Sequence, residues 1–223
     1  PTGWRSFVAS SGVDGAYILH TRCQRSNDNP QHYKECPMNK HSKLKPIETK
    51  FKGYRFRSRL EARWAVFFDA LRLQYEYEIE GFSLPSGEAY LPDFLLRDMG
   101  IYVEVKPKDQ LELRELKKLS NFVFGGEYQL LLILGSPTKH EMLLIDKASS
   151  SVTEYEEEYE KESDIVSEYL NGLRDFSRVT FGRSPLHQGW TLVFSPLPPP
   201  LEVDLQRAFL KAKQARFEFG EEG

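Results

Sequence analysis

Cysteine is scarce in this chain of 223 residues: only two are present, which excludes a disulfide-rich scaffold. Long apolar runs are also missing, because the longest, residues 130–134, is far shorter than the roughly 20 residues of a membrane-spanning helix. No secretion signal is recognisable in the given residues, and no segment repeats. We therefore expect a soluble protein that is not secreted and has no membrane contact.

The net charge is small, −3, but it is unevenly distributed along the chain. Residues 1–72 hold 14 Lys and Arg against 6 Asp and Glu, whereas residues 73–223 hold 16 against 27. Much of the acidic excess falls between Glu154 and Glu162. This asymmetry is typical of a basic face for a polyanion or of an ordinary solvated surface, and charge alone favours the second interpretation.

Residues 57–134 carry the clearest structural pattern. Apolar residues recur every three or four positions over residues 60–71, with Ser58 as N-cap and Glu61 as its capping-box partner, which predicts a helix. Strands are expected over 75–79, 90–96 and 101–105, the last two joined as a hairpin through 97–100. A helix over 111–122 and a buried strand over 128–134 follow. The order predicts an α/β fold with a mixed sheet flanked by helices.

The composition divides the chain into four parts. We expect a basic extension over residues 1–52, a core over 53–147, an acidic insertion over 148–164, and a carboxy-terminal extension over 165–223 that packs on the core. The acidic insertion is either mobile or the start of a charged helix. Further strands are expected near 16–20, 142–145 and 190–194, and further helices over 165–176 and 202–217.

Four residues stand out as candidates for chemistry. Asp93 follows a proline on one predicted strand, and Glu104 and Lys106 lie two apart on the next, so both point to one face of the sheet. Glu61 lies in the first turns of the preceding helix. Carboxylates from neighbouring strands and a helix, with the backbone carbonyl of Val105, offer the hard oxygen ligands that Mg²⁺ or Mn²⁺ requires.

These motifs carry a resemblance to a known family. Residues 91–94 (LPDF) and 103–107 (VEVKP), with ten residues between the aspartate and the glutamate, resemble the PD-(D/E)xK nuclease superfamily, and residues 57–62 (RSRLEA) extend the likeness. The resemblance covers about residues 51–134 and implies a restriction-endonuclease-like core. It implies that Asp93 and Glu104 are metal ligands, that Glu61 completes the metal site, and that Lys106 serves the attacking water or the scissile phosphate.

The function that the resemblance implies is metal-dependent hydrolysis of DNA phosphodiester bonds, leaving a 5′-phosphate and a 3′-hydroxyl. The wording of the motifs is similar to small phage and mobile-element nucleases and to the endonuclease subunit of heteromeric transposases, which needs a partner. A nucleic-acid-binding or assembly module that does not cut, and RNA as substrate, stay open. We expect a cytoplasmic or DNA-associated protein, a homodimer if both strands are cut, and a protein partner at the acidic segment or terminal helix.

Basic residues surround the predicted catalytic helix and are candidates for binding phosphates of the nucleic acid. They are Lys50, Lys52, Arg55, Arg57, Arg59, Arg63 and Lys108. Tyr54 and Phe56 interleave with them and either stack on a base or belong to the core, the second being favoured for Phe56.

A second group of residues has the spacing of a zinc site. His20, Cys23, His32 and Cys36 offer four nitrogen and sulfur ligands in a region poor in apolar residues, where a structural Zn²⁺ would replace a missing core. The alternative, which we favour, is a set of unrelated loop residues.

Overall fold

The structure is a computed structural model, and it describes residues 46–108, 110–126, 128–149, 151–184, 189–194 and 202–217. The expected strand near residues 16–20 and the expected zinc ligands His20, Cys23, His32 and Cys36 lie outside these ranges. The elements in chain order are β1 (Thr49–Phe51), β2 (Tyr54–Phe56), α1 (Arg59–Ala70), β3 (Tyr75–Tyr77), β4 (Phe82–Ser83), β5 (Ala89–Tyr90), β6 (Phe94–Leu96), β7 (Ile101–Lys106), α2 (Leu113–Gly126), β8 (Leu130–Ser136), β9 (Lys139–Ile145), α3 (Val152–Glu158), α4 (Glu162–Phe176), β10 (Val179–Arg183), β11 (Trp190–Phe194) and α5 (Val203–Gln214).

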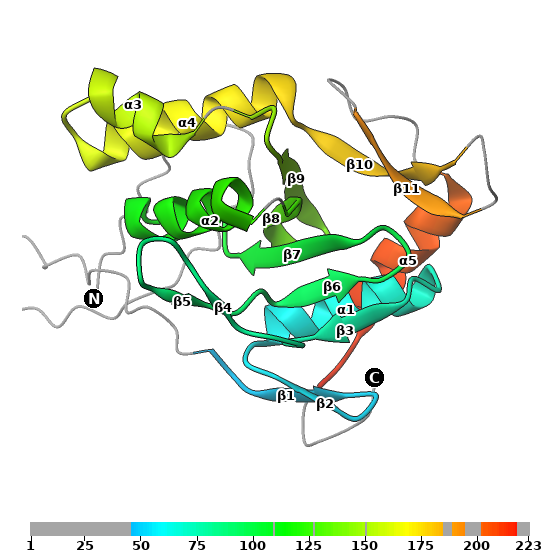
Figure 1. Cartoon of the computed structure of the whole chain (residues 1–223). Coiled ribbons are helices and arrows are strands. Elements are labelled where there is room, and N and C mark those ends of the chain that lie inside the picture. The colour runs from blue at the N-terminus through cyan, green and yellow to red at the C-terminus, as the bar shows by residue number, and fades with distance from the viewer. Residues whose placement is uncertain are drawn as a thin grey trace, which may run out of the picture. The chain divides into compact units, whose positions relative to one another are not determined.

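Five strands form one mixed sheet in the order β3-β6-β7-β8-β9 (Figure 1). β7 and β8 run parallel, whereas the other neighbours run antiparallel. A parallel pair needs a crossover connection, and α2 supplies it. The predicted α/β class, the mixed sheet and the hairpin between β6 and β7 are confirmed. So is the order helix, three sheet strands, helix, strand from α1 to β8, interrupted only by the small β4–β5 ribbon.

Helix α1 begins where the sequence predicts it. The Ser58 side chain accepts a hydrogen bond from the backbone N–H of Glu61 at 3.2 Å, which caps the first turn. The predicted return bond to the cap residue's own N–H is replaced, because the Glu61 carboxylate accepts from the N–H of Arg57 instead. The apolar face of the helix buries Trp64, Phe67 and Phe68 completely.

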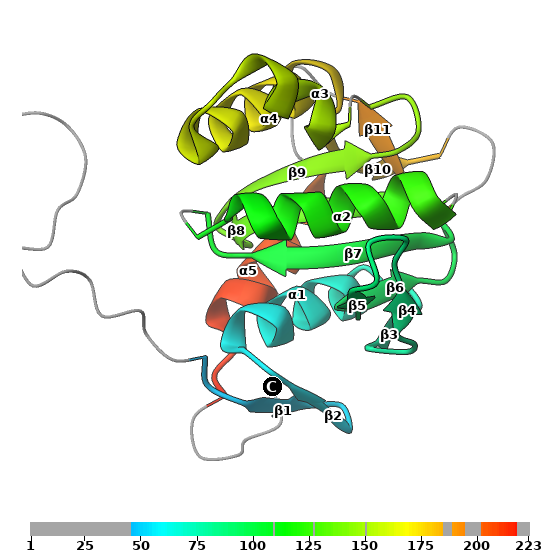
Figure 2. The same ribbon diagram turned by 60° about the vertical axis from the view of Figure 1, so that its left-hand side comes forward.

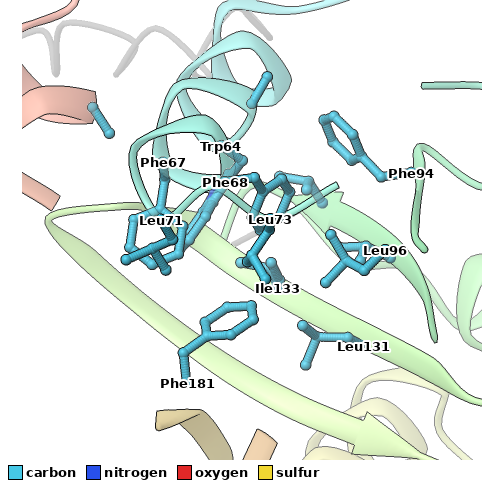
Figure 3. Packing of buried hydrophobic residues seen from close by; sticks show 14 of the residues in the cluster. Trp64, Phe67, Phe68, Leu71, Leu73, Phe94, Leu96, Leu131, Ile133 and Phe181 are labelled. Carbon is cyan, nitrogen blue, oxygen red and sulfur yellow. The ribbon is translucent and has the colours of Figure 1, made fainter. Parts of the chain in front are cut away.

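The sheet separates two hydrophobic cores, because successive residues of β7 and β8 point to opposite faces. Val103, Val105, Leu131 and Ile133 face α1, and Figure 3 shows Trp64, Phe67, Phe68 and Phe181 gathered there. The alternate residues Tyr102, Leu130, Leu132 and Leu134 pack with α2 and α4 (Figure 2). The sequence 130–134 is therefore apolar throughout because both faces of β8 are buried.

The strand predicted over residues 90–96 is wrong as one element. β5 ends at Tyr90 and pairs with β4 in a separate ribbon, whereas β6 begins at Phe94 in the main sheet. Pro92 lies in the gap, and its ring nitrogen has no hydrogen for a sheet ladder. The break leaves Asp93 at the entrance of β6, next to the end of β7.

The carboxy-terminal part contains the strand expected over 190–194 as β11 and the helices expected over 165–176 and 202–217 as α4 and α5, and it adds the unpredicted strand β10. β10 pairs with β11 as a hairpin, and the acidic segment contains α3, which begins with a capping box of Ser151 and Glu154. α5 packs on α1, where the rings of Phe209 and Phe67 stack with centroids 4.5 Å apart. The helices in the described ranges are too short or too polar to cross a lipid bilayer.

The tight turn between β8 and β9 generates a stability prediction. Gly135 has φ +97°, and a Cβ there would collide with the backbone carbonyl of Lys139, whereas Gly100 has φ +67° with open space around it. We expect Gly135→Ala to lower the free energy of unfolding by about 3 kcal/mol and Gly100→Ala by about 1 kcal/mol. Urea unfolding of both variants measures the difference, and equal losses would contradict it.

Candidate active site

The three acidic residues singled out in the sequence are deeply buried. Asp93, Glu104 and Glu61 are 3%, 5% and 7% exposed, and no other Asp or Glu of the described residues is buried. They come from the start of β6, the end of β7 and the start of α1, which lie at one end of the sheet (Figure 1). A buried carboxylate is costly unless it is paired, so the partners of these three groups define the site.

The Asp93 side chain takes the place of a backbone hydrogen-bond partner for β7, just before β6 begins. One carboxylate oxygen accepts a hydrogen bond from the Val105 N–H at 2.8 Å, and the other accepts from the Arg57 guanidinium at 2.8 Å. The N–H and C=O of one residue in a strand point to the same side. The Val105 carbonyl is therefore directed to the Asp93 side of β7.

Glu104 lies on the opposite face from Val105, toward α2. One oxygen of its carboxylate accepts a hydrogen bond from the Tyr90 hydroxyl at 2.8 Å, and the other lies 3.0 Å from the Lys106 ammonium. Tyr90 ends β5, so the small β4–β5 ribbon positions this carboxylate. The sheet thus presents Glu104 and Lys106 together, as their spacing on the strand predicted.

Lys106 is held between two carboxylates. Its ammonium nitrogen lies 3.0 Å from a Glu104 oxygen and 2.9 Å from a Glu115 oxygen at the start of α2. Burial alone would lower the pKa of Lys106, but the two carboxylates outweigh burial and raise the pKa above its ordinary value of 10.5. The side chain is therefore a charged ammonium at neutral pH.

Glu61 makes a dense set of hydrogen bonds at the start of α1. Its carboxylate accepts from the Tyr77 hydroxyl at 2.6 Å, the Ser58 hydroxyl at 2.7 Å and the Arg57 N–H at 3.1 Å. Glu61 acts on Asp93 through its charge, which helps to raise the pKa of Asp93. The structure thus gives Glu61 a capping role in addition to its place near the other two carboxylates.

The electrostatics of the site favour a cation or a proton beside the carboxylates. Burial, and then the charges of Glu104 and Glu61, raise the pKa of Asp93 well above its ordinary value of 3.8. Burial also raises the pKa of Glu104, and the Lys106 ammonium only partly offsets this effect. Among the described residues, no three His, Cys, Asp or Glu side chains stand close enough together to be recognised as a metal-ligand group.

The seven basic residues predicted to bind phosphate have different surroundings. Lys52, Arg55 and Lys108 form ion pairs with Asp69, Glu48 and Glu141. Arg57 turns into the site, where it pairs with Asp93 and also with Glu78. Lys50 is exposed on β1, and Arg59 and Arg63 line a cavity on α1. Tyr54 and Phe56 pack in the core between the sheet and α1, which is the alternative that the sequence favoured for Phe56.

Two partners of the site are absent from the sequence prediction. Tyr90 was taken only as the start of a strand, and no pattern in the sequence connects it with Glu104. Glu115 lies in the first turn of α2, which returns over the end of β7 because it is the crossover between two parallel strands. An acidic residue in the first turn of a crossover helix is a signal that could have identified Glu115.

The raised pKa of Glu104 generates a prediction about stability. The folded state binds its proton more tightly than the unfolded state does, so ionisation costs stability as the pH rises above the ordinary value of 4.5. Glu104→Gln keeps a hydrogen bond to Tyr90 and an oxygen for Lys106 without the charge. We expect it to be more stable than the wild type by about 1 kcal/mol at pH 8, with a smaller difference at pH 5. Urea unfolding at both pH values measures this, and a variant less stable at both would contradict it.

Comparisons with protein-family models, with curated proteins and with solved structures found no match for this chain. The geometry and charge of the buried carboxylate site, together with the motifs, are therefore what bear on function.

Proposed function

We propose that this chain is a metal-dependent nuclease that hydrolyses phosphodiester bonds in DNA, built on a restriction-endonuclease-like core. The observation that supports it is the burial of Glu61, Asp93 and Glu104 at one end of the sheet, with Lys106 beside them. A fold gains little stability from such a group, because each buried carboxylate costs several kcal/mol to desolvate. Buried carboxylates such as Asp93 and Glu104, whose pKa values burial raises, are typical of active sites.

The donor chemistry fits a hard divalent cation. Asp93, Glu104 and the Val105 carbonyl would hold Mg²⁺ or Mn²⁺ through oxygen, and the raised pKa values of both carboxylates indicate a site short of positive charge. When bound, the ion supplies charge stabilisation for the scissile phosphate and a more acidic water. Glu61 contributes its charge while its hydrogen bonds fix the start of α1.

Lys106 is suited to stabilise negative charge. Because Glu104 and Glu115 raise its pKa, the side chain is a permanent ammonium and a poor acceptor for the proton of water. Its nitrogen is held by two carboxylates, which fixes where it can donate to a phosphate oxygen. We therefore assign it to the phosphate and assign proton removal elsewhere.

One observation favours a second candidate, a nucleic-acid-binding module that does not cut. The Arg57 guanidinium neutralises Asp93 at 2.8 Å and competes with any cation for this carboxylate. In the nuclease, Arg57 would have to release Asp93 when the metal binds. In a module without a metal, the ion pair would be permanent.

The nuclease proposal predicts the loss of cleavage in two variants. Asp93→Asn and Glu104→Gln each remove a charged oxygen from the site, so we expect at least a roughly 1000-fold lower rate of cleavage. The assay follows conversion of supercoiled plasmid with Mg²⁺, Mn²⁺ or EDTA, alongside linear, branched and single-stranded DNA and RNA. Asp175→Asn, an exposed position on α4, is the matched control and should cut like the wild type. Cleavage at the wild-type rate by Asp93→Asn or Glu104→Gln would contradict the proposal.

The competition at Asp93 predicts a change in metal affinity. Arg57→Gln removes a positive charge next to the carboxylate, so we expect Mn²⁺ to bind roughly 5-fold to 10-fold more tightly at pH 8. Calorimetric titration of the full chain without nucleic acid measures this directly. Arg55→Gln removes an equal charge from the same segment, but from an exposed pair with Glu48, and should leave the affinity unchanged. Weaker Mn²⁺ binding in Arg57→Gln would show that Arg57 supports the site rather than competes for it.

A further inference from the structure

The end of α5 lies beside the start of α1 (Figure 2), and a basic cavity lies between them. Its volume is about 520 Å³. The residues that line it are Arg59, Arg63, Lys213, Gln214, Ala215, Arg216 and Phe217. Four of these seven carry a positive charge and none carries a negative charge. We call this cavity the α1–α5 basic pocket.

The cations of this pocket differ from Lys211 and Arg183, two basic residues on or near α5, in their partners. Lys211, one turn from the pocket on α5, lies 3.8 Å from Asp69, and Arg183 pairs with Asp204. In the described part of the chain, the four pocket cations have no acidic side chain within ion-pair distance. Positive charges that lie close together without acidic partners repel one another, so a bound anion would lower the electrostatic energy of the pocket.

Two donors of the pocket are also left without acceptors. The Nε atoms of Arg59 and Arg63 are shielded from solvent and have no hydrogen-bond partner among the described residues. A buried donor without an acceptor costs free energy, which a ligand oxygen would recover. Guanidinium groups present a planar set of donors that matches phosphate oxygens. The pocket therefore suits an anion with several oxygen acceptors.

The pocket and the carboxylate site share one helix end. Residues 59 and 63 lie one turn apart on the same side of α1, whereas Glu61 points about 200° away around the helix. A helix with side chains is about 10–12 Å wide. That width corresponds to about three steps of duplex at 3.4 Å per step along each strand. A nucleic acid lying across the start of α1 would therefore reach both sites.

We propose that the α1–α5 basic pocket binds backbone phosphates of the nucleic acid, about three or more steps from the bond that is cut. The identity of the ligand rests on the proposed nuclease function. The phosphate contacts would fix the position of the strand relative to Asp93 and Glu104 without reading the bases. Two of the four pocket cations, Lys213 and Arg216, lie outside α1 and can be replaced without changing the helix that carries Glu61.

The test is the affinity of the full chain for a labelled 20-bp duplex in EDTA, so that no cleavage occurs. Arg63→Gln and Lys213→Gln each remove one phosphate contact, so we expect each to weaken binding roughly 8-fold at 0.1 M salt. The slope of log affinity against log salt should fall by about 0.9 for each charge removed. The double variant should combine both losses.

Arg207→Gln is the matched control, because Arg207 is an exposed cation on α5 outside the pocket. It should keep the wild-type affinity and salt slope. If Arg63→Gln and Lys213→Gln bind duplex like Arg207→Gln, the pocket proposal is overturned. It is also overturned if these variants only lower the melting temperature, which is what cations that merely complement the carboxyl end of α5 would do.

Further results distinguish a failure of the pocket proposal from a failure of the nuclease proposal, and a site for duplex phosphates from a site for a free anion. Weakened duplex binding in the pocket variants, with no cleavage by the wild type under any metal, keeps the pocket and rejects the nuclease. Metal-dependent cleavage by the wild type, with unchanged duplex binding in the pocket variants, keeps the nuclease and rejects the pocket. Calorimetric titration with inorganic phosphate should show weak binding. Tight phosphate binding that Arg63→Gln abolishes, with duplex affinity unchanged, would show a site for a free anion and overturn the proposal.

Discussion

The hydrogen bond from the Val105 N–H to the Asp93 carboxylate is the interaction on which the site depends. The backbone ladder between β6 and β7 ends just before β6 begins, and there the Asp93 carboxylate accepts the Val105 N–H in place of a backbone carbonyl. The bond holds the entrance of β6 against the end of β7. It thereby brings a carboxylate, a backbone carbonyl and the Glu104–Lys106 pair to one end of the sheet.

Two of the three buried carboxylates, Asp93 and Glu104, are partly compensated by cations of the protein. Lys106 bridges Glu104 and Glu115 across the end of β7, and Arg57 bridges Asp93 and Glu78. Each of these cations contacts more than one acid, so removing one partner does not release it. An ion or a phosphate that enters the site must therefore exchange with existing pairs.

The parts of this fold that local rules govern could be predicted from the sequence. The face of α1, its Ser58 cap and the hairpin that aligns Asp93 with Glu104 depend on residues that are close together in the chain. The ion pairs of Lys52 and Lys108 join residues 17 and 33 positions apart, and no periodicity reports such contacts. For the same reason the inward turn of Arg57, 36 positions from Asp93, could not be distinguished from an exposed phosphate contact.

Helix α1 carries three separate tasks. Trp64, Phe67 and Phe68 fill the first core, Glu61 faces the carboxylates, and Arg59 and Arg63 line the basic pocket. Inserting a single residue directly before Trp64 would rotate what precedes it by about 100° relative to the core face. Glu61 and the two arginines would then no longer point to their partners, although every residue type would be retained. Length variation among related chains should therefore be confined to the loops before and after this helix.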